Sequence, residues 1–204
     1  MIDGVHIWHA ALDEPGWPGS EELPPEERKR AGDFLRAEPG RRWVASRWAL
    51  RRVLADYLEL PPAAIEIEVG EAGKPRLAAG GGLGFNLSHS EGLALIAVAE
   101  QDVGVDVELI RPERDLRALA ERALPAADAA AVSAAPEDER AAVFHRAWAR
   151  HEARLKCLGT GLGSEPRRTP VAVQDLDVAP GFAAAVAVVG AETGPVLCRP
   201  LPAG

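Results

Sequence analysis

Hydrophobic and polar residues alternate along several short stretches of the chain and recur at helical spacing along others. Alternation with a period of two predicts β-strands, and apolar residues three and four positions apart predict helices with one buried face. The expected strands span residues 5–9, 65–69, 83–88, 93–99, 103–108, 171–178, 183–189 and 196–199. The expected helices span residues 26–35, 41–58, 115–124, 126–131 and 137–158.

The order of these elements predicts an α+β fold built from two similar halves. Strand, helices and strands follow one another twice along the chain, although no sequence repeat is visible. We place the boundary near residue 100, which gives an N-terminal half, 1–100, and a C-terminal half, 101–204. Ligands commonly bind at an interface between two such halves.

Composition and charge narrow the classes of function. The chain has 204 residues and a formal net charge of −8, which argues against a nucleic-acid-binding protein. It contains no run of about 18 apolar residues, so we expect no membrane span. The first residues lack the basic and apolar regions of a secretory signal. Two cysteines are too few for a disulfide framework, so a cytoplasmic location is expected.

Three carboxylates and a lysine are the strongest candidates for chemistry. Asp106 and Glu108 are two positions apart on an expected strand, so both side chains lie on one face. Glu152 and Lys156 are four positions apart on an expected helix, so they also share a face. Mg²⁺ prefers such oxygen ligands together with substrate phosphates. The alternative is a solvated strand face and an ordinary stabilising pair on a helix.

Two polar segments offer groups that could bind an anion. Ser88 and His89 follow an apolar strand, where they would donate hydrogen bonds from a strand-to-strand turn. The alternative for this segment is a turn that the hydroxyl groups merely stabilise. Lys74 lies in a second turn, within the sequence Gly-Lys-Pro-Arg.

The helix expected at 41–58 is rich in arginine, including Arg42, Arg47 and Arg51. These side chains form either a solvated polar face or a local patch that attracts an anion or an acidic partner.

Taken together, four segments in this order resemble the 4′-phosphopantetheinyl transferase superfamily, in its pseudo-dimeric, surfactin-synthetase-activating type. They are residues 73–75, 86–90, 104–108 and 148–156. The resemblance implies two α+β halves related by a pseudo-twofold axis, with coenzyme A in the cleft between them. It also implies transfer of the 4′-phosphopantetheine arm of coenzyme A to a serine of an apo acyl or peptidyl carrier protein. Adenosine 3′,5′-bisphosphate would leave, Mg²⁺ would bridge the pyrophosphate, and the protein would act as a monomer.

The resemblance assigns roles in catalysis and metal binding to the acidic cluster. Asp106, Glu108 and Glu152 would be the metal ligands. Glu152 would also act as general base toward the carrier serine, either directly or through a metal-linked water. Lys156 would contact the pyrophosphate and assist the leaving group.

Further residues would bind coenzyme A. Ser88 and His89 would contact its phosphates, and Lys74 and Arg42 would hold the adenosine phosphates. His151 stands where the family usually has a lysine that contacts a phosphate. A neutral histidine keeps a hydrogen-bond donor but not the full charge, so we hypothesise that coenzyme A binds more tightly when His151 is protonated.

Alternative functions stay open at this stage. A Mg²⁺-dependent diphosphate hydrolase would use a similar set of carboxylates, and the histidine substitution would also suit a coenzyme A-binding relative with impaired catalysis. Carriers for polyketide, nonribosomal peptide and fatty-acid synthesis all remain open. For the arginine-rich helix we predict that changing Arg47 and Arg51 to Glu weakens carrier use more than coenzyme A binding.

Overall fold

The computed structural model describes residues 2–70, 73–78, 80, 82–112, 115–160 and 169–203. The strands are β1 (Val5–Ala11), β2 (Ile67–Val69), β3 (Pro75–Leu77), β4 (Gly84–Ser90), β5 (Leu93–Ala99), β6 (Val103–Leu109), β7 (Val171–Leu176), β8 (Phe182–Val189) and β9 (Val196–Pro200). The α-helices are α1 (Pro25–Gly32), α2 (Ala37–Leu58), α3 (Leu116–Ala123), α4 (Ala126–Ala134) and α5 (Glu137–Leu158). Two short 3-10 helices are η1 (Ser20–Glu22) and η2 (Pro62–Ala64). The predicted α+β class is confirmed.

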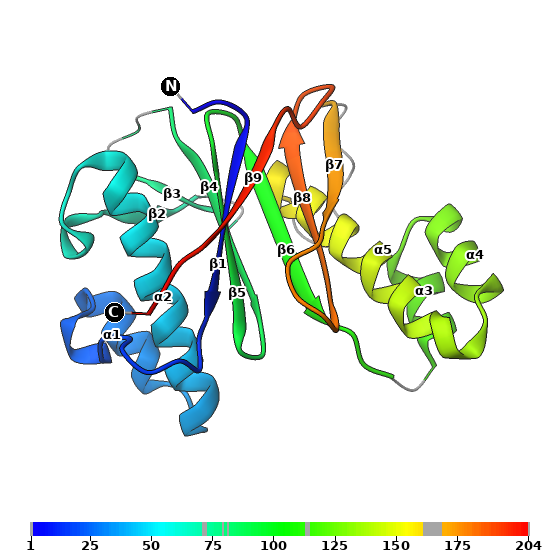
Figure 1. Ribbon diagram of the computed structural model, residues 1–204, viewed down its shortest axis with the longest axis horizontal. Coiled ribbons are helices and arrows are strands. Elements are labelled where there is room, and N and C mark those ends of the chain that lie inside the picture. Colours follow the sequence, from blue (N-terminus) through cyan, green and yellow to red (C-terminus); the bar gives the residue numbers. More distant parts are fainter. Residues whose placement is uncertain are drawn as a thin grey trace.

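The strands form two principal sheets, each with helices of its own (Figure 1). The first sheet has the order β4-β5-β1-β9, and α1 and α2 lie beside it. The second has the order β6-β8-β7, and α3, α4 and α5 lie on its side of the molecule. Strands β2 and β3 form a separate antiparallel pair. The chain therefore consists of two α+β halves whose edge strands meet near the middle.

The last strand returns to the first sheet. β9 pairs in parallel with β1, with Val196 opposite Val5 and Pro200 opposite His9. The boundary expected at residue 100 places this strand with the C-terminal half, whereas the structure pairs it with the N-terminal sheet. Sequence order could not reveal this crossover, because pairing is decided by contacts between distant segments.

A core between the two halves buries one face of β6. Val103, Val105 and Val107 are fully or almost fully buried there, together with Val5 and Ile7 of β1. The alternation in the sequence correctly predicted that these valines share one face. The opposite face of β6, which carries Asp106 and Glu108, is therefore turned away from this core.

Helix α5 packs directly on that opposite face, at Gly104. A Cβ atom on Gly104 would lie 2.1 Å from the carbonyl oxygen of Ala153 and 2.3 Å from the backbone nitrogen of Cys157. Glycine is thus required for the helix backbone to approach the strand. This close approach brings Lys156 within reach of Asp106.

Several predicted element boundaries differ from the structure. Strand β4 continues to Ser90, because His89 and Ser90 still pair with Ala94 and Leu93 of β5. The prediction that Ser88 and His89 lie in a turn is therefore wrong. Helix α1 ends at Gly32, three residues earlier than predicted, and α2 begins at Ala37.

An ion-pair network attaches α1 to α2. None of the eight residues of α1 is buried. Glu27 accepts hydrogen bonds from Arg51 Nε at 2.9 Å and from Arg47 Nε at 3.0 Å. Burial raises the pKa of Glu27, but the hydrogen bonds from Arg51 and Arg47 outweigh it and hold the pKa below its ordinary value. The side chains of Arg51 and Arg47 are 3% and 13% exposed, so both serve the fold, which argues against the partner-binding patch that the sequence suggested.

Within the described residues, no helix combines the length and apolar content that crossing a membrane requires.

Candidate active site

A buried aspartate, a serine and a lysine meet where the two halves join. Lys156 Nζ on α5 donates to Asp106 Oδ1 on β6 at 2.6 Å and to Ser88 Oγ on β4 at 3.0 Å. Ser88 Oγ in turn donates to the same oxygen of Asp106 at 2.9 Å. Asp106 is 3% exposed and Ser88 is 7% exposed. Three elements that are distant in sequence thus supply one closed hydrogen-bonded group.

Asp106 and two further carboxylates, those of Glu108 and Glu152, all have raised pKa values. Burial raises the pKa of Asp106, while the charge and hydrogen bond of Lys156 oppose the rise. Burial also raises the pKa of Glu108, and the negative charge of Asp106 adds to it. For Glu152, burial and Asp106 raise the pKa and Lys156 lowers it. Acids whose charges raise one another's pKa in a partly desolvated site favour a bound cation, because a cation relieves their mutual repulsion.

The donor set fits a divalent metal ion that is shared with a substrate. Asp106 Oδ2 is buried and has no hydrogen-bond partner among the described residues. That leaves one carboxylate oxygen available, while Oδ1 is held by Lys156 and Ser88. No three acidic, histidine or cysteine side chains of the described chain are already grouped closely enough to enclose a metal ion. Mg²⁺ does not require such a cage, since one or two carboxylates, waters and substrate phosphates commonly suffice.

Two residues predicted to bind coenzyme A lie on α5 and β4 beside this group. His151 is partly buried on α5, next to Glu152. His89 follows Ser88 on β4, and its side chain is exposed. Desolvation by the surrounding protein nevertheless lowers the pKa of His89, and the positive charge of Lys156 lowers it further. At neutral pH this favours the uncharged form of His89, which still has one N–H donor.

The other two predicted cations contact carboxylates outside the central group. Arg42 on α2 forms ion pairs with Asp13 at 2.8 Å, with Glu38 at 2.8 Å and with Glu91 at 2.7 Å. Of these acids, Glu91 lies in the turn between β4 and β5, one residue beyond Ser90. Arg42 is therefore held in place by three acids.

Lys74 lies at the C-terminal end of α5. Its Nζ donates to the carbonyl oxygen of Cys157 at 2.8 Å and to Asp102 Oδ1 at 2.8 Å. A cation here satisfies a free carbonyl and interacts favourably with the negative end of the helix. Lys74 thus links the N-terminal half to the helix that carries Lys156 and Glu152.

Sequence reasoning missed two polar residues at this interface. Asn86 Oδ1 accepts a hydrogen bond from the backbone N–H of Val105 at 2.9 Å. Ser90 Oγ accepts one from the backbone N–H of Leu109 at 3.1 Å. A signal was present, because residues 86, 88 and 90 are polar at a period of two, but it does not show which strand they face.

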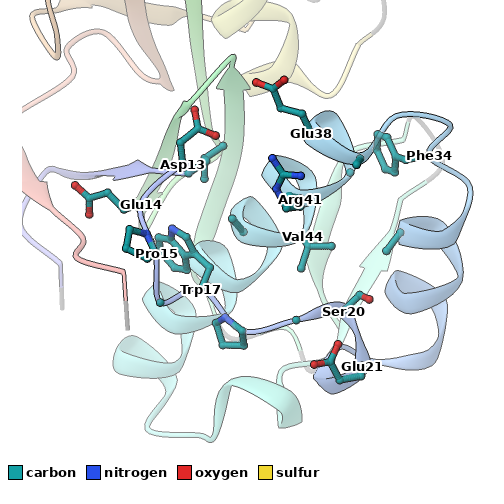
Figure 2. A pocket seen from close by; sticks show the side chains of 18 of the residues that line it. Asp13, Glu14, Pro15, Trp17, Ser20, Glu21, Phe34, Glu38, Arg41 and Val44 are labelled. Carbon is teal, nitrogen blue, oxygen red and sulfur yellow. The ribbon is translucent and has the colours of Figure 1, made fainter.

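A cavity of about 760 Å³ opens in the N-terminal half, between the segment that follows β1 and helices α1 and α2 (Figure 2). Trp17, Phe34 and Val44 give it apolar walls, and Glu38 and Arg41 line its rim. None of the predicted site residues, all of which the structure describes, lines this cavity. The candidate site at the interface between β4, β6 and α5 is therefore separate from this cavity.

The fold and this interface define an α+β enzyme of two halves with a carboxylate–lysine centre between them. Comparisons with known proteins identify the family. The model of the 4′-phosphopantetheinyl transferase superfamily matches residues 102–187, and that of the 4′-phosphopantetheinyl transferase N-terminal region matches residues 17–101.

Curated relatives carry the same activity in their names. The 4′-phosphopantetheinyl transferase HetI of Nostoc sp. is 35% identical over 212 residues, covering 93% of this chain and 90% of that protein. The 4′-phosphopantetheinyl transferase AcpT of Escherichia coli is 39% identical, covering 67% of this chain and 66% of that protein. A Xenopus laevis protein, L-aminoadipate-semialdehyde dehydrogenase-phosphopantetheinyl transferase, is 30% identical, covering 71% of this chain and 52% of that protein.

The chain belongs to the 4′-phosphopantetheinyl transferase superfamily and has the enzymatic class of a 4′-phosphopantetheinyl transferase. The family predicted from the four sequence segments is confirmed.

Proposed function

We propose that this enzyme transfers the 4′-phosphopantetheine arm of coenzyme A to a serine hydroxyl of an apo acyl or peptidyl carrier protein, in a Mg²⁺-dependent reaction. The serine oxygen forms a bond to the phosphorus that carries the pantetheine arm. The bond from that phosphorus to the bridging pyrophosphate oxygen breaks. Adenosine 3′,5′-bisphosphate is the leaving group, and the serine proton passes to a base on the enzyme or to water.

The observation that carries this proposal is that the two carboxylate oxygens of Asp106 have different surroundings. Lys156 and Ser88 both donate to Oδ1, and buried Oδ2 has no partner among the described residues. With Glu108 on the same face of β6, this carboxylate would hold Mg²⁺ beside the pyrophosphate. Mg²⁺ there would neutralise charge that develops on the phosphate oxygens.

Lys156 would stabilise the leaving group, and Glu152 would accept the serine proton. The side chain of Lys156 is 30% exposed, so while Nζ contacts Asp106 it would also be able to donate to a phosphate oxygen of the substrate. A fixed cation at that position stabilises negative charge on the leaving group.

Glu152 has a pKa that burial raises, which makes it a stronger base than an ordinary carboxylate. It would accept the serine proton directly or through a water molecule. As a third metal ligand it would be a weaker base, so the route through water suits that arrangement. His89, Lys74, Arg42 and His151 would contribute to the binding of coenzyme A.

The test is to incubate the enzyme with coenzyme A, Mg²⁺ and an apo carrier protein, and then to weigh the carrier by mass spectrometry. A mass gain equal to the phosphopantetheine arm supports transfer. Consumption of coenzyme A without a change in the carrier supports a diphosphate hydrolase. Retained binding of coenzyme A without turnover supports a relative with impaired catalysis.

A matched pair of variants tests the site. Asp106→Asn removes the charge of the buried carboxylate, and Asp138→Asn makes the same change on the exposed first turn of α5. We expect transfer to fall by about 10²–10³-fold in the first variant, as for other fixed electrostatic groups, and to be unchanged in the second. Equal activity in both variants would refute the assignment of Asp106.

A further inference from the structure

Two acceptors of different kinds hold Lys74 where the N-terminal half meets the end of helix α5. Its Nζ donates to the backbone carbonyl oxygen of Cys157 at 2.8 Å and to Asp102 Oδ1 at 2.8 Å. Cys157 is a buried residue, whereas the side chain of Asp102 is 67% exposed. One acceptor is therefore neutral and belongs to the packed helix, and the other is charged and faces solvent.

Hydrogen bonds fix the backbone on both sides of this ion pair. The carbonyl oxygen of Lys74 accepts from the backbone N–H of Gly70 at 3.0 Å, just before β3 begins at Pro75. The carbonyl oxygen of Asp102 accepts from the backbone N–H of Val189 at 3.0 Å, just before β6 begins. The fold itself thus keeps the carboxylate of Asp102 beside the ammonium group of Lys74.

Asp102 neutralises the charge that Lys74 would offer to an anionic ligand. A phosphate oxygen and a carboxylate oxygen accept from the same N–H donors of a lysine. A phosphate that reaches Lys74 must therefore displace Asp102 or lie close to its negative charge. Displacement is feasible because an exposed carboxylate regains water and an exposed ion pair contributes little. The bond to the carbonyl of Cys157 would still hold the lysine in place.

We propose that Asp102 limits the affinity of this enzyme for coenzyme A by competing with the adenosine phosphates of the substrate for Lys74. When coenzyme A binds, Lys74 keeps its bond to the carbonyl oxygen of Cys157, and a phosphate oxygen replaces Asp102 Oδ1. The carboxylate of Asp102 then turns into solvent. This inference rests on the proposed function, in which Lys74 contributes to the binding of coenzyme A, and it adds a residue that weakens that binding.

Calorimetry of coenzyme A binding without a carrier protein measures this competition. Asp102→Asn keeps the shape of the side chain and removes its charge. At low salt we expect the variant to bind coenzyme A about two- to fivefold more tightly than the wild type, which is the range of an exposed ion pair. The gain should shrink toward 1 M salt, where the Debye length falls to about 3 Å.

A matched substitution and a double variant show whether the effect passes through Lys74. Asp138→Asn removes the same charge near the opposite end of α5, about 30 Å along the helix from Cys157, and should leave the affinity unchanged. Lys74→Met should weaken binding by about 10–100-fold, because a charge-assisted hydrogen bond is lost. In the Lys74→Met background, Asp102→Asn should give no gain, since the two residues act as a contacting pair.

Every other outcome has a definite meaning. Unchanged or weaker binding of coenzyme A by Asp102→Asn would overturn the inference, because the carboxylate would then support Lys74 instead of competing for it. An equal gain in Asp138→Asn, or in the Lys74→Met background, would also overturn it, because the overall charge would then explain the effect. If the expected affinities are found but the wild type leaves the mass of the carrier unchanged, only the proposed transfer reaction is refuted.

Discussion

Gly104→Ala should separate helix α5 from strand β6 and disturb the active site without removing any polar group. The new Cβ would lie 2.1 Å from the carbonyl oxygen of Ala153, whereas ordinary van der Waals contact begins at 3.4 Å. The helix backbone must therefore retreat by about 1.3 Å. A shift of that size would stretch the 2.6 Å contact between Lys156 and Asp106 beyond hydrogen-bonding distance.

The magnitude follows from the cost of overpacking a tight contact. We expect Gly104→Ala to lower the free energy of unfolding by about 1–3 kcal/mol. For a chain of this length that corresponds to a fall in melting temperature of about 2–12 °C. The rate of transfer should fall by more than the loss of folded protein explains. A misplacement of about 1 Å at a reacting centre can lower the rate about 10²-fold.

Thermal unfolding followed by circular dichroism and the carrier mass assay measure the two effects. Gly32→Ala is the matched control, because a Cβ atom there meets nothing within 4 Å. It should be neutral or slightly stabilising, since alanine is the better helix former. A Gly104→Ala protein with wild-type melting temperature and activity would refute the argument that close contact between α5 and β6 builds the site.

Three further predictions concern charges and thiols. Glu27→Gln should lose about 1–3 kcal/mol of stability, and it should also remove the contribution of Glu27 to the loss of stability that the wild type shows as pH falls below the ordinary glutamate value of 4.5 and through the lowered pKa of Glu27; a wild-type pH profile in the variant would contradict this. Lys74→Met should cost about 0.5–2 kcal/mol in urea unfolding, because the C-terminal end of α5 loses a cation, and an unchanged midpoint would count against that role. At pH 8 a thiol reagent should modify Cys198 in the native protein but not Cys157, because Cys157 is 1% exposed and burial raises its pKa to about 11; rapid labelling of both before unfolding would disprove it.

Local patterns were sufficient for most of the elements. The helix predicted at 137–158 and the strand predicted at 93–99 match α5 and β5 residue for residue. Both have an unambiguous period, and Gly159, with φ 61°, stops the helix where the sequence suggests. The end of strand β4 was predicted two residues too early, because polar residues at its end resemble a turn until their partners on β5 are known.

The arginines of α2 show the limit of reading charge from sequence. The positions of Arg47 and Arg51 along the helix are those expected of a solvated face, yet both side chains form ion pairs with Glu27 of α1. A buried ion pair leaves no periodic signal, because the partner lies on a separate helix. The same holds for Asn86 and Ser90, whose partners are backbone groups of another sheet.

The sequence by itself determined the chemistry that is available: two carboxylates on one strand face, a glutamate and a lysine one helical turn apart, and their order along the chain. Those relations depend only on local geometry, which the strand and helix periods define. The tertiary structure alone decided which of these groups touch. Contact between Asp106, Ser88 and Lys156 depends on the approach of α5 at Gly104 and on the register of β4 against β6. Lys156 is 50 residues from Asp106 and 68 from Ser88, and Ser88 is 18 from Asp106, so both arrangements are set by packing between different elements.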